Sequence, residues 1–286
     1  MIISASRRTD IPAFYSDWFF GRIREGFAEV KNPFNPANVR KVSLKPEDVD
    51  CIVFWTKNPK PMIDRLDELK DYEFYFQFTL NSYGKDIEKN VPSKIGEIID
   101  TFKALSEKIG KERLIWRYDP ILITEKYTEE YHIKWFERLT DMLSGSFDSC
   151  VISFIDSYAK TEKRFKENGV RELTKTEISN IAKKFSKISQ ERNFQINTCA
   201  EKYDLSSLGV GHSSCIDKSR IEKLTGKSLN LQKDKYQRKE CGCCESTDIG
   251  AYNTCIHKCV YCYANGSEKT TEKNYSEHDR SAAALN

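Results

Sequence analysis

Long apolar runs are absent from this 286-residue chain. A helix that crosses a bilayer needs about 20 consecutive apolar residues, and every apolar run here is much shorter, which excludes a membrane-spanning helix. A secretory signal peptide would place a basic segment before an apolar one, whereas Met1-Ile2-Ile3-Ser4 has the pattern of a strand. We therefore expect a cytoplasmic protein that does not contact membranes.

A strong excess of charge of one sign is also missing. The 46 lysine and arginine residues are nearly balanced by 43 aspartate and glutamate residues, and the two signs are mixed along the chain. This balance argues against the broad basic surface that extended nucleic acid requires, although it allows a local basic pocket. We therefore expect no extended contact with nucleic acid.

Cysteine, by contrast, is plentiful, with ten residues. Cytosolic thiols stay reduced, so disulfide bonds do not account for this number. Cys51 and Cys150 stand alone in apolar runs, and we expect both to be small buried hydrophobic residues. The other eight all follow residue 198, which indicates metal or cluster ligation in that part of the chain.

The first two thirds of the chain alternate between two patterns. Short β-branched or aromatic runs, typical of strands, occupy residues 1–5, 50–55, 73–80, 113–118, 150–155 and 194–198. Helical patterns lie between them at residues 15–27, 61–70, 93–109, 129–143 and 176–191. This order predicts an α/β fold with a parallel sheet, and we expect a partial or complete (β/α) barrel of the TIM type over residues 1–198. Residues 32–45 are expected to be irregular, and residues 269–286 to form a polar tail.

Polar side chains follow several of the predicted strands. Because parallel β/α folds place their active sites at the C-terminal ends of the strands, these side chains are candidate catalytic residues. For each of them a structural role, such as an ion pair or a loop contact, is the alternative. They are Arg7, Arg8, Asp10, Lys57, Arg117 and Asp156.

Cys255, Cys259 and Cys262 form the pattern C-x3-C-x2-C. Three thiolates this close in sequence hold three irons of a four-iron cluster and leave the fourth iron open to another ligand. With ten cysteines, chance would produce this spacing in about one such chain per hundred, so the spacing by itself is only suggestive. A structural zinc site that uses a nearby cysteine or histidine is the alternative.

The cysteine motif, with Tyr261 directly before its third cysteine, resembles the signature of radical S-adenosylmethionine (SAM) enzymes. Residues 248–265 look like the first strand and cluster loop of proteins similar to spore photoproduct lyase. Nearly the whole chain, including Ser4-Ala5-Ser6-Arg7-Arg8-Thr9-Asp10-Ile11-Pro12 and Phe54-Trp55-Thr56-Lys57-Asn58-Pro59, resembles the DUF1848 family, whose substrate is not established. The resemblance implies a 4Fe–4S cluster that reductively cleaves SAM to a 5′-deoxyadenosyl radical, with an electron from a flavodoxin or ferredoxin.

The position of the motif departs from that pattern, because the cluster loop normally follows the first barrel strand near the N-terminus. Circular permutation accounts for the difference if residues 248–253 form that first strand and pair beside residues 1–5. The usual glycine-rich SAM-binding turn is also replaced, here by Ser4-Ala5-Ser6-Arg7-Arg8. Arg7 or Arg8 then pairs either with a SAM carboxylate or with a substrate anion. The expected cofactor-binding residues are Ser4, Ser6, Tyr261 and Asn265.

The cysteine-rich region, residues 199–268, contains a second possible ligand set. Cys199, Cys215, Cys241 and Cys243 are expected to hold an auxiliary iron–sulfur cluster, and a zinc ion on the same four thiolates is the alternative. Taken together, the residues and the resemblance predict a radical SAM enzyme acting on an unknown small-molecule or nucleotide-type substrate, with an anionic group that the cations after the strands would suit. A zinc-stabilised module that binds nucleic acid or protein without catalysis, and a two-cluster electron-transfer protein, are the alternative functions.

Overall fold

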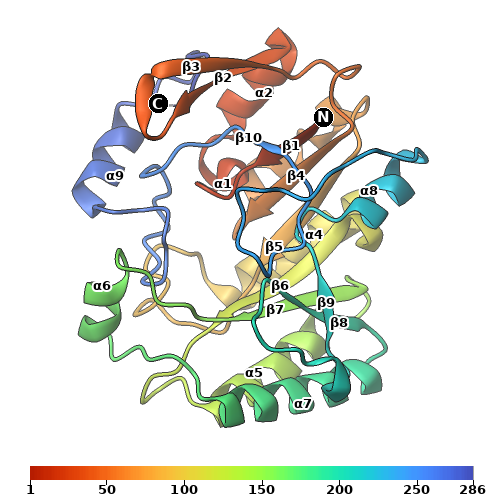
Figure 1. The fold of residues 1–286 in the computed structure, drawn as a ribbon, viewed down its shortest axis with the longest axis vertical. Helices are drawn as coiled ribbons and strands as arrows, with labels where there is room; N and C mark the ends of the chain where they lie inside the picture. The colour runs from red at the N-terminus through yellow and green to blue at the C-terminus, as the bar shows by residue number, and fades with distance from the viewer. Residues whose placement is uncertain (286) are drawn as a thin grey trace.

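A computed structural model describes residues 1–285 and shows an α/β fold built on one parallel sheet (Figure 1). Every ladder in this sheet is parallel, in the strand order β10-β1-β4-β5-β6-β7-β8-β9. Its strands are β1 (Ile2–Ala5), β4 (Cys51–Thr56), β5 (Phe74–Thr79), β6 (Leu114–Ile121), β7 (Ser149–Phe154), β8 (Gln195–Cys199), β9 (Gly211–Ser213) and β10 (Thr247–Asp248). The predicted parallel α/β architecture is confirmed, with β10 and β9 as the two edges of the sheet.

Helices cover one face of this sheet. They are α1 (Ile11–Phe14), α2 (Ser16–Glu25), α3 (Lys60–Ile63), α4 (Ile99–Ile109), α5 (Glu129–Met142) and α7 (Lys175–Glu191), with a kinked, non-helical turn at Lys94–Ile98 and short 3-10 helices at Leu66–Leu69, Lys111–Arg113 and Ser206–Leu208. Alternate strand residues such as Phe54, Phe76 and Trp116 face this layer, because successive strand side chains point to opposite faces. No helix among residues 1–285 is long and apolar enough to cross a membrane.

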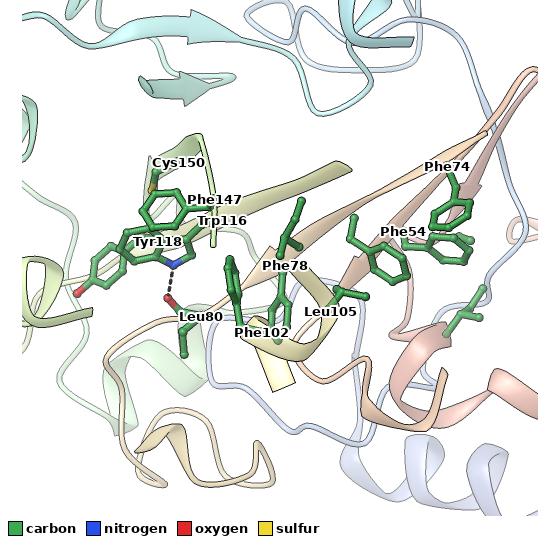
Figure 2. Close-up of a cluster of buried hydrophobic side chains, with 14 of the residues drawn as sticks. Phe54, Phe74, Phe78, Leu80, Phe102, Leu105, Trp116, Tyr118, Phe147 and Cys150 are labelled. Carbon is green, nitrogen blue, oxygen red and sulfur yellow. Dashed lines mark hydrogen bonds between the residues drawn. The ribbon is translucent and has the colours of Figure 1, made fainter. Parts of the chain in front are cut away.

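The core between the sheet and the helices is largely aromatic (Figure 2). Phe136 of α5 stacks on Phe185 of α7 with ring centroids 3.7 Å apart, and on Trp116 of β6 at 5.0 Å. The indole nitrogen of Trp116 donates to the carbonyl oxygen of Leu80 at 3.0 Å, which satisfies its polar atom inside the core. Cys150 is buried here, as expected, and Cys51 is buried on the opposite face of the sheet.

The cysteine-rich segment covers that opposite face. Cys199, Cys215, Cys241 and Cys243 pack with Ile216 and with Ile221 of α8 (Lys218–Thr225) against the second set of strand side chains, which includes Ile2, Val53, Tyr75, Ile115 and Val151. Both faces of the sheet are therefore buried, as is usual for parallel sheets.

The C-terminal strand β10 lies beside the N-terminal strand β1, as the sequence predicts. Ile3 pairs with Thr247 and Ser4 with Asp248, in parallel. The strand ends at Asp248 instead of continuing to residue 253. Past that point Gly250 lies so close to Ser6 that an added Cβ would come within 2.1 Å of the serine hydroxyl. Beyond Asp248 the chain leaves the sheet and enters residues 249–265, which carry Cys255, Cys259 and Cys262 and are named the cluster loop after their predicted role.

One prediction about an exposed segment is wrong. Residues 32–45 are not irregular, because β2 (Phe27–Asn32) and β3 (Asn35–Ser43) form an antiparallel hairpin with its turn at Pro33 and Phe34. The polar residues near the C-terminus contain α9 (Glu268–Ser276), whose first turn is capped by Ser267. The chain then docks beside the hairpin in Figure 1, where the Glu29 amide donates to the Ala283 carbonyl at 2.8 Å.

Candidate active site

One cavity of about 330 Å³ opens at the C-terminal ends of the strands. The six candidate catalytic residues and both cysteine groups meet there, although they are spread from residue 7 to residue 262. The predicted residues that line it are Arg7, Arg8, Asp10, Lys57, Arg117, Asp156, Ser6, Tyr261, Cys199, Cys215, Cys241, Cys243, Cys255, Cys259 and Cys262. Convergence of this kind follows from the parallel sheet, because each strand delivers its following loop to the same edge.

Side chains from two directions hold the cluster loop. Asn265 donates from Nδ2 to the carbonyl of Cys255 at 2.6 Å, within the loop itself. Arg164 of α6 (Glu162–Glu167) donates to the carbonyls of Cys262 at 2.5 Å and of Cys259 and Asn265 at 3.4 Å each. Nothing in the sequence marks Arg164, because these contacts cross about a hundred residues of chain. Asn265 thus positions the loop, and its predicted contact with a cofactor stays a prediction.

The first group supplies the three thiols of a cluster site, but burial opposes their ionisation. All three are free and line the cavity, and burial raises the pKa of Cys259 to about 12. Burial also raises the pKa of Cys262, but backbone N–H groups of Ala264 and Asn265 act in the opposite direction by hydrogen bonding to its sulfur. Such donors stabilise a thiolate that binds metal. Within residues 1–285 no three histidine, cysteine or acidic side chains converge on one point as ligands of a single ion would, whereas cluster thiolates bind separate irons.

A buried carboxylate lies behind the loop. Glu88 accepts hydrogen bonds from Lys57 at 2.7 Å and from Asn81 at 3.2 Å, and also from Lys94 and from the Tyr261 hydroxyl. Burial alone would raise the pKa of Glu88, yet the two ammonium groups hold it well below its ordinary range. Lys57 therefore already has an ion-pair partner. Glu88 also connects the cluster loop to the ends of β4 and β5. Sequence reasoning missed Glu88, whose contact with Tyr261 spans 173 residues.

Asp10 and His257 form a second buried pair at the cavity. The Nε2 atom of His257 lies 2.8 Å from Oδ2 of Asp10, which also accepts the backbone N–H of Lys57 at 2.7 Å. The other Asp10 oxygen caps α1 through the amide of Ala13. Asp10 thus joins the loop after β1 to the loop after β4 and to the cluster loop.

Several buried polar atoms at the cavity have no partner among residues 1–285. They are Nη2 of Arg7, Oγ1 of Thr9 and Nδ1 of His257. Unsatisfied buried groups are costly and rare, so their gathering fits a cavity whose polar ligand completes them.

Ser4 and Ser6, which are predicted to bind the cofactor, already donate their hydroxyl hydrogens within the protein. Ser4 and Ser6 donate to the two carboxylate oxygens of Asp248 at 2.7 and 2.6 Å, and the Arg7 amide donates to the same carboxylate at 2.8 Å. Asp248 therefore shapes the loop that stands in place of a glycine-rich turn. Arg8 lies over the ring of Tyr252 with its guanidinium 5.2 Å from the centroid, turned toward the same β10 region.

The second cysteine group is compact. The sulfurs of Cys199 and Cys215 lie 3.1 Å apart, and Nη1 of Arg117 is 2.9 Å from the Cys215 sulfur. Hydrogen bonds among the cysteines, with a smaller contribution from Arg7, lower the pKa values of Cys241 and Cys243 to about 6. Cys241 and Cys243 thus ionise readily, which suits metal ligation, whereas hydrogen bonds with the neighbouring thiols raise the pKa of Cys199. Asp156, by contrast, pairs with Arg238 at the mouth of the cavity.

Comparison with known protein families supports a relationship over most of the chain. The model of a domain of unknown function, DUF1848, matches residues 2–264. This match spans the sheet, both cysteine groups and the loop after β1. Among curated proteins, none matches the chain.

Proposed function

This chain belongs to the DUF1848 family, and we propose that it is a radical SAM enzyme. The observation that carries the proposal is the convergence of Cys255, Cys259 and Cys262 with the loop after β1 at one cavity. Bound there, a 4Fe–4S cluster and SAM would supply a 5′-deoxyadenosyl radical that abstracts hydrogen from the substrate.

The chain's own residues have distinct tasks in this proposal. Arg164 and Asn265 keep the three cysteines in place through the loop carbonyls. Glu88 holds Lys57 and the Tyr261 hydroxyl on the inner side of the loop. The unpartnered atoms of Thr9 and His257 provide polar contacts for SAM.

The pairing of β10 with β1 supports circular permutation of a radical SAM barrel. In that arrangement β10 takes the place of the first barrel strand and β1 that of the second, while the cluster loop still opens onto the cavity. We infer that the parallel sheet corresponds to a partial barrel, whose inner face the cysteine-rich segment fills.

We infer a small or nucleotide-type substrate with an anionic group. Most cations that line the cavity already face carboxylates: Lys57 pairs with Glu88, Arg117 with Asp119 and Arg238 with Asp156. Arg7 lies 3.9 Å from Asp234 through Nη1, and its unpartnered Nη2 retains a donor for one anionic group. The cavity volume excludes a duplex from its interior.

We propose that Cys199, Cys215, Cys241 and Cys243 hold an auxiliary iron–sulfur cluster, with zinc as the alternative metal. Their convergence at the same cavity and the depressed pKa values of two of them support this proposal. All ten cysteines are free, which suits a reducing cytoplasm where a flavodoxin or ferredoxin donates the electron.

The test is anaerobic reconstitution with iron and sulfide, followed by dithionite, SAM and chromatography for 5′-deoxyadenosine. We expect the wild-type protein to form this product, and each of Cys255→Ala, Cys259→Ala and Cys262→Ala to abolish it. Cys150→Ala is the matched control, because Cys150 is buried in the aromatic core away from the cavity. Uptake of zinc alone, with no 5′-deoxyadenosine, would refute the proposal and favour the binding module.

A further inference from the structure

Side chains of the sheet hold both the carbonyl oxygen and the sulfur of Cys215. The Tyr75 hydroxyl and Nε2 of Gln77 both donate to its carbonyl oxygen, at 2.6 and 3.0 Å. Its sulfur in turn accepts an N–H from Arg117 at 2.9 Å. These three side chains project from adjacent strands β5 and β6, so the sheet itself fixes both ends of this residue.

Arg117 has little freedom to leave the sulfur. Its side chain is 8% exposed, Nε donates to Asp119 at 3.0 Å, and Nη1 also reaches Gln77 at 3.2 Å. Asp119 is itself held by the Ser153 hydroxyl and by its backbone bond to Asn81 at 2.7 Å. The guanidinium is therefore a fixed positive donor, directed at one thiolate.

We propose that Arg117 is a positioning residue that raises the reduction potential of a metal centre on the second cysteine group above that of a cluster on the first. A hydrogen bond and a positive charge on a ligand sulfur stabilise the more negative, reduced state of an iron–sulfur centre. Arg7 adds a second positive charge near Cys215 and Cys243. This inference rests on the auxiliary cluster of the proposed function.

The first cysteine group has a different electrostatic environment. The sulfurs of Cys255 and Cys262 receive backbone N–H groups, not a guanidinium. Lys57 and Lys94 share a single carboxylate, Glu88, and Arg164 donates to carbonyls of the loop, not to a sulfur. A lower potential than at the second group follows, because no charged donor bonds to a sulfur of the first group. The two groups therefore line one cavity but differ in how easily a centre on each accepts an electron.

The experiment is a redox titration of the anaerobically reconstituted full-length protein, followed by electron paramagnetic resonance. We expect two reduced-cluster signals, of which the one that survives in the triple variant C255A/C259A/C262A has the higher midpoint potential. Arg117→Gln lowers that midpoint and leaves the other unchanged, whereas Arg117→Lys, which keeps the charge, gives a smaller shift. Arg238→Gln removes the same charge from the cavity without touching a cysteine, and we expect it to shift neither midpoint.

Several outcomes would overturn the inference. They are a second site that holds zinc, a midpoint that Arg117→Gln does not move, and equal shifts from Arg117→Gln and Arg238→Gln. Circular dichroism identifies a variant that does not fold. If Arg117→Gln does not fold, the midpoint potential of Arg117→Lys is the test, and an unshifted value would overturn the inference. Failure of this inference is distinguishable from failure of the proposed function. Formation of 5′-deoxyadenosine by the wild-type protein in the same preparation depends on the first cysteine group alone, so it would still support the proposed function.

Discussion

Replacing Glu88 with glutamine tests the buried network behind the cluster loop. The carboxylate is 1% exposed, and two lysines, an asparagine and a tyrosine donate to it. Glutamine has a similar shape but no charge, so the ammonium groups of Lys57 and Lys94 lose their shared counter-ion. Leaving a buried charge without its partner costs about 3 to 5 kcal/mol.

That loss corresponds to a fall in melting temperature of roughly 6 to 20 °C for a chain of this size. The assay is thermal unfolding of the anaerobically reconstituted protein at pH 7. Glu68→Gln is the matched control, because Glu68 pairs with Arg24 and Arg65 at the surface. We expect this change to cost less than about 1 kcal/mol.

A double-mutant cycle with Lys57→Gln measures the coupling directly. Removing both partners should cost less than the sum of the single changes, by about 0.5 to 3 kcal/mol. Additive effects, or a Glu88→Gln change no larger than that of Glu68→Gln, would refute the view that this ion pair is buried and structural.

The pH dependence of the same pair has a defined sign. The pKa of Glu88 lies well below its ordinary value of 4.5 in the folded state, because of Lys57 and Lys94. Its ionisation therefore stabilises the fold fully above about pH 4.5, and this contribution is lost as the pH falls toward the lower, folded-state pKa. The difference in stability between wild type and Glu88→Gln should be constant near neutrality and shrink in acid.

Two further changes test the core and the cluster loop. Phe136→Ala removes the ring stacked 3.7 Å from Phe185 and should cost about 3 to 5 kcal/mol in chemical denaturation; a loss below about 1 kcal/mol would contradict the packing. Arg164→Gln releases the carbonyls of Cys259 and Cys262, so a chelator should remove iron faster than from wild type. Equal rates would show that Arg164 does not hold the loop.

The six predicted strands were recognisable because each combines a short apolar run with polar flanking residues. Their alternation with helices then implies parallel pairing, which brings residues 7, 57, 117 and 156 to one edge of the sheet. The hairpin β2–β3 escaped prediction because most of its side chains are exposed and leave no apolar period to detect. Strand β10 is too short, at two residues, to produce a local pattern of its own.

The supporting residues of the site were not predictable in the same way. Asp248 bonds to Ser4, Ser6 and the amide of Arg7 across more than 240 residues, and Glu88 and Arg164 reach the cluster loop across 173 and 98. Each is an ordinary charged residue in a polar stretch, and its role depends on the tertiary fold. The cysteines were recognisable because their spacing carries chemical information without the fold.

The pairing of β1 with β10 also has a consequence for biosynthesis. Ser4 and Asp248 are 244 residues apart, so at 5 to 20 residues per second the ribosome completes β10 roughly 10 to 50 s after β1. Throughout that interval one edge of β1 has no partner strand, and exposed edges invite aggregation. The cysteines at 255, 259 and 262 are made later still. If this loop binds a cluster as proposed, a nascent chain can recruit iron to it only after nearly all of the sheet has been synthesised, and metal loading is then a late step of biosynthesis.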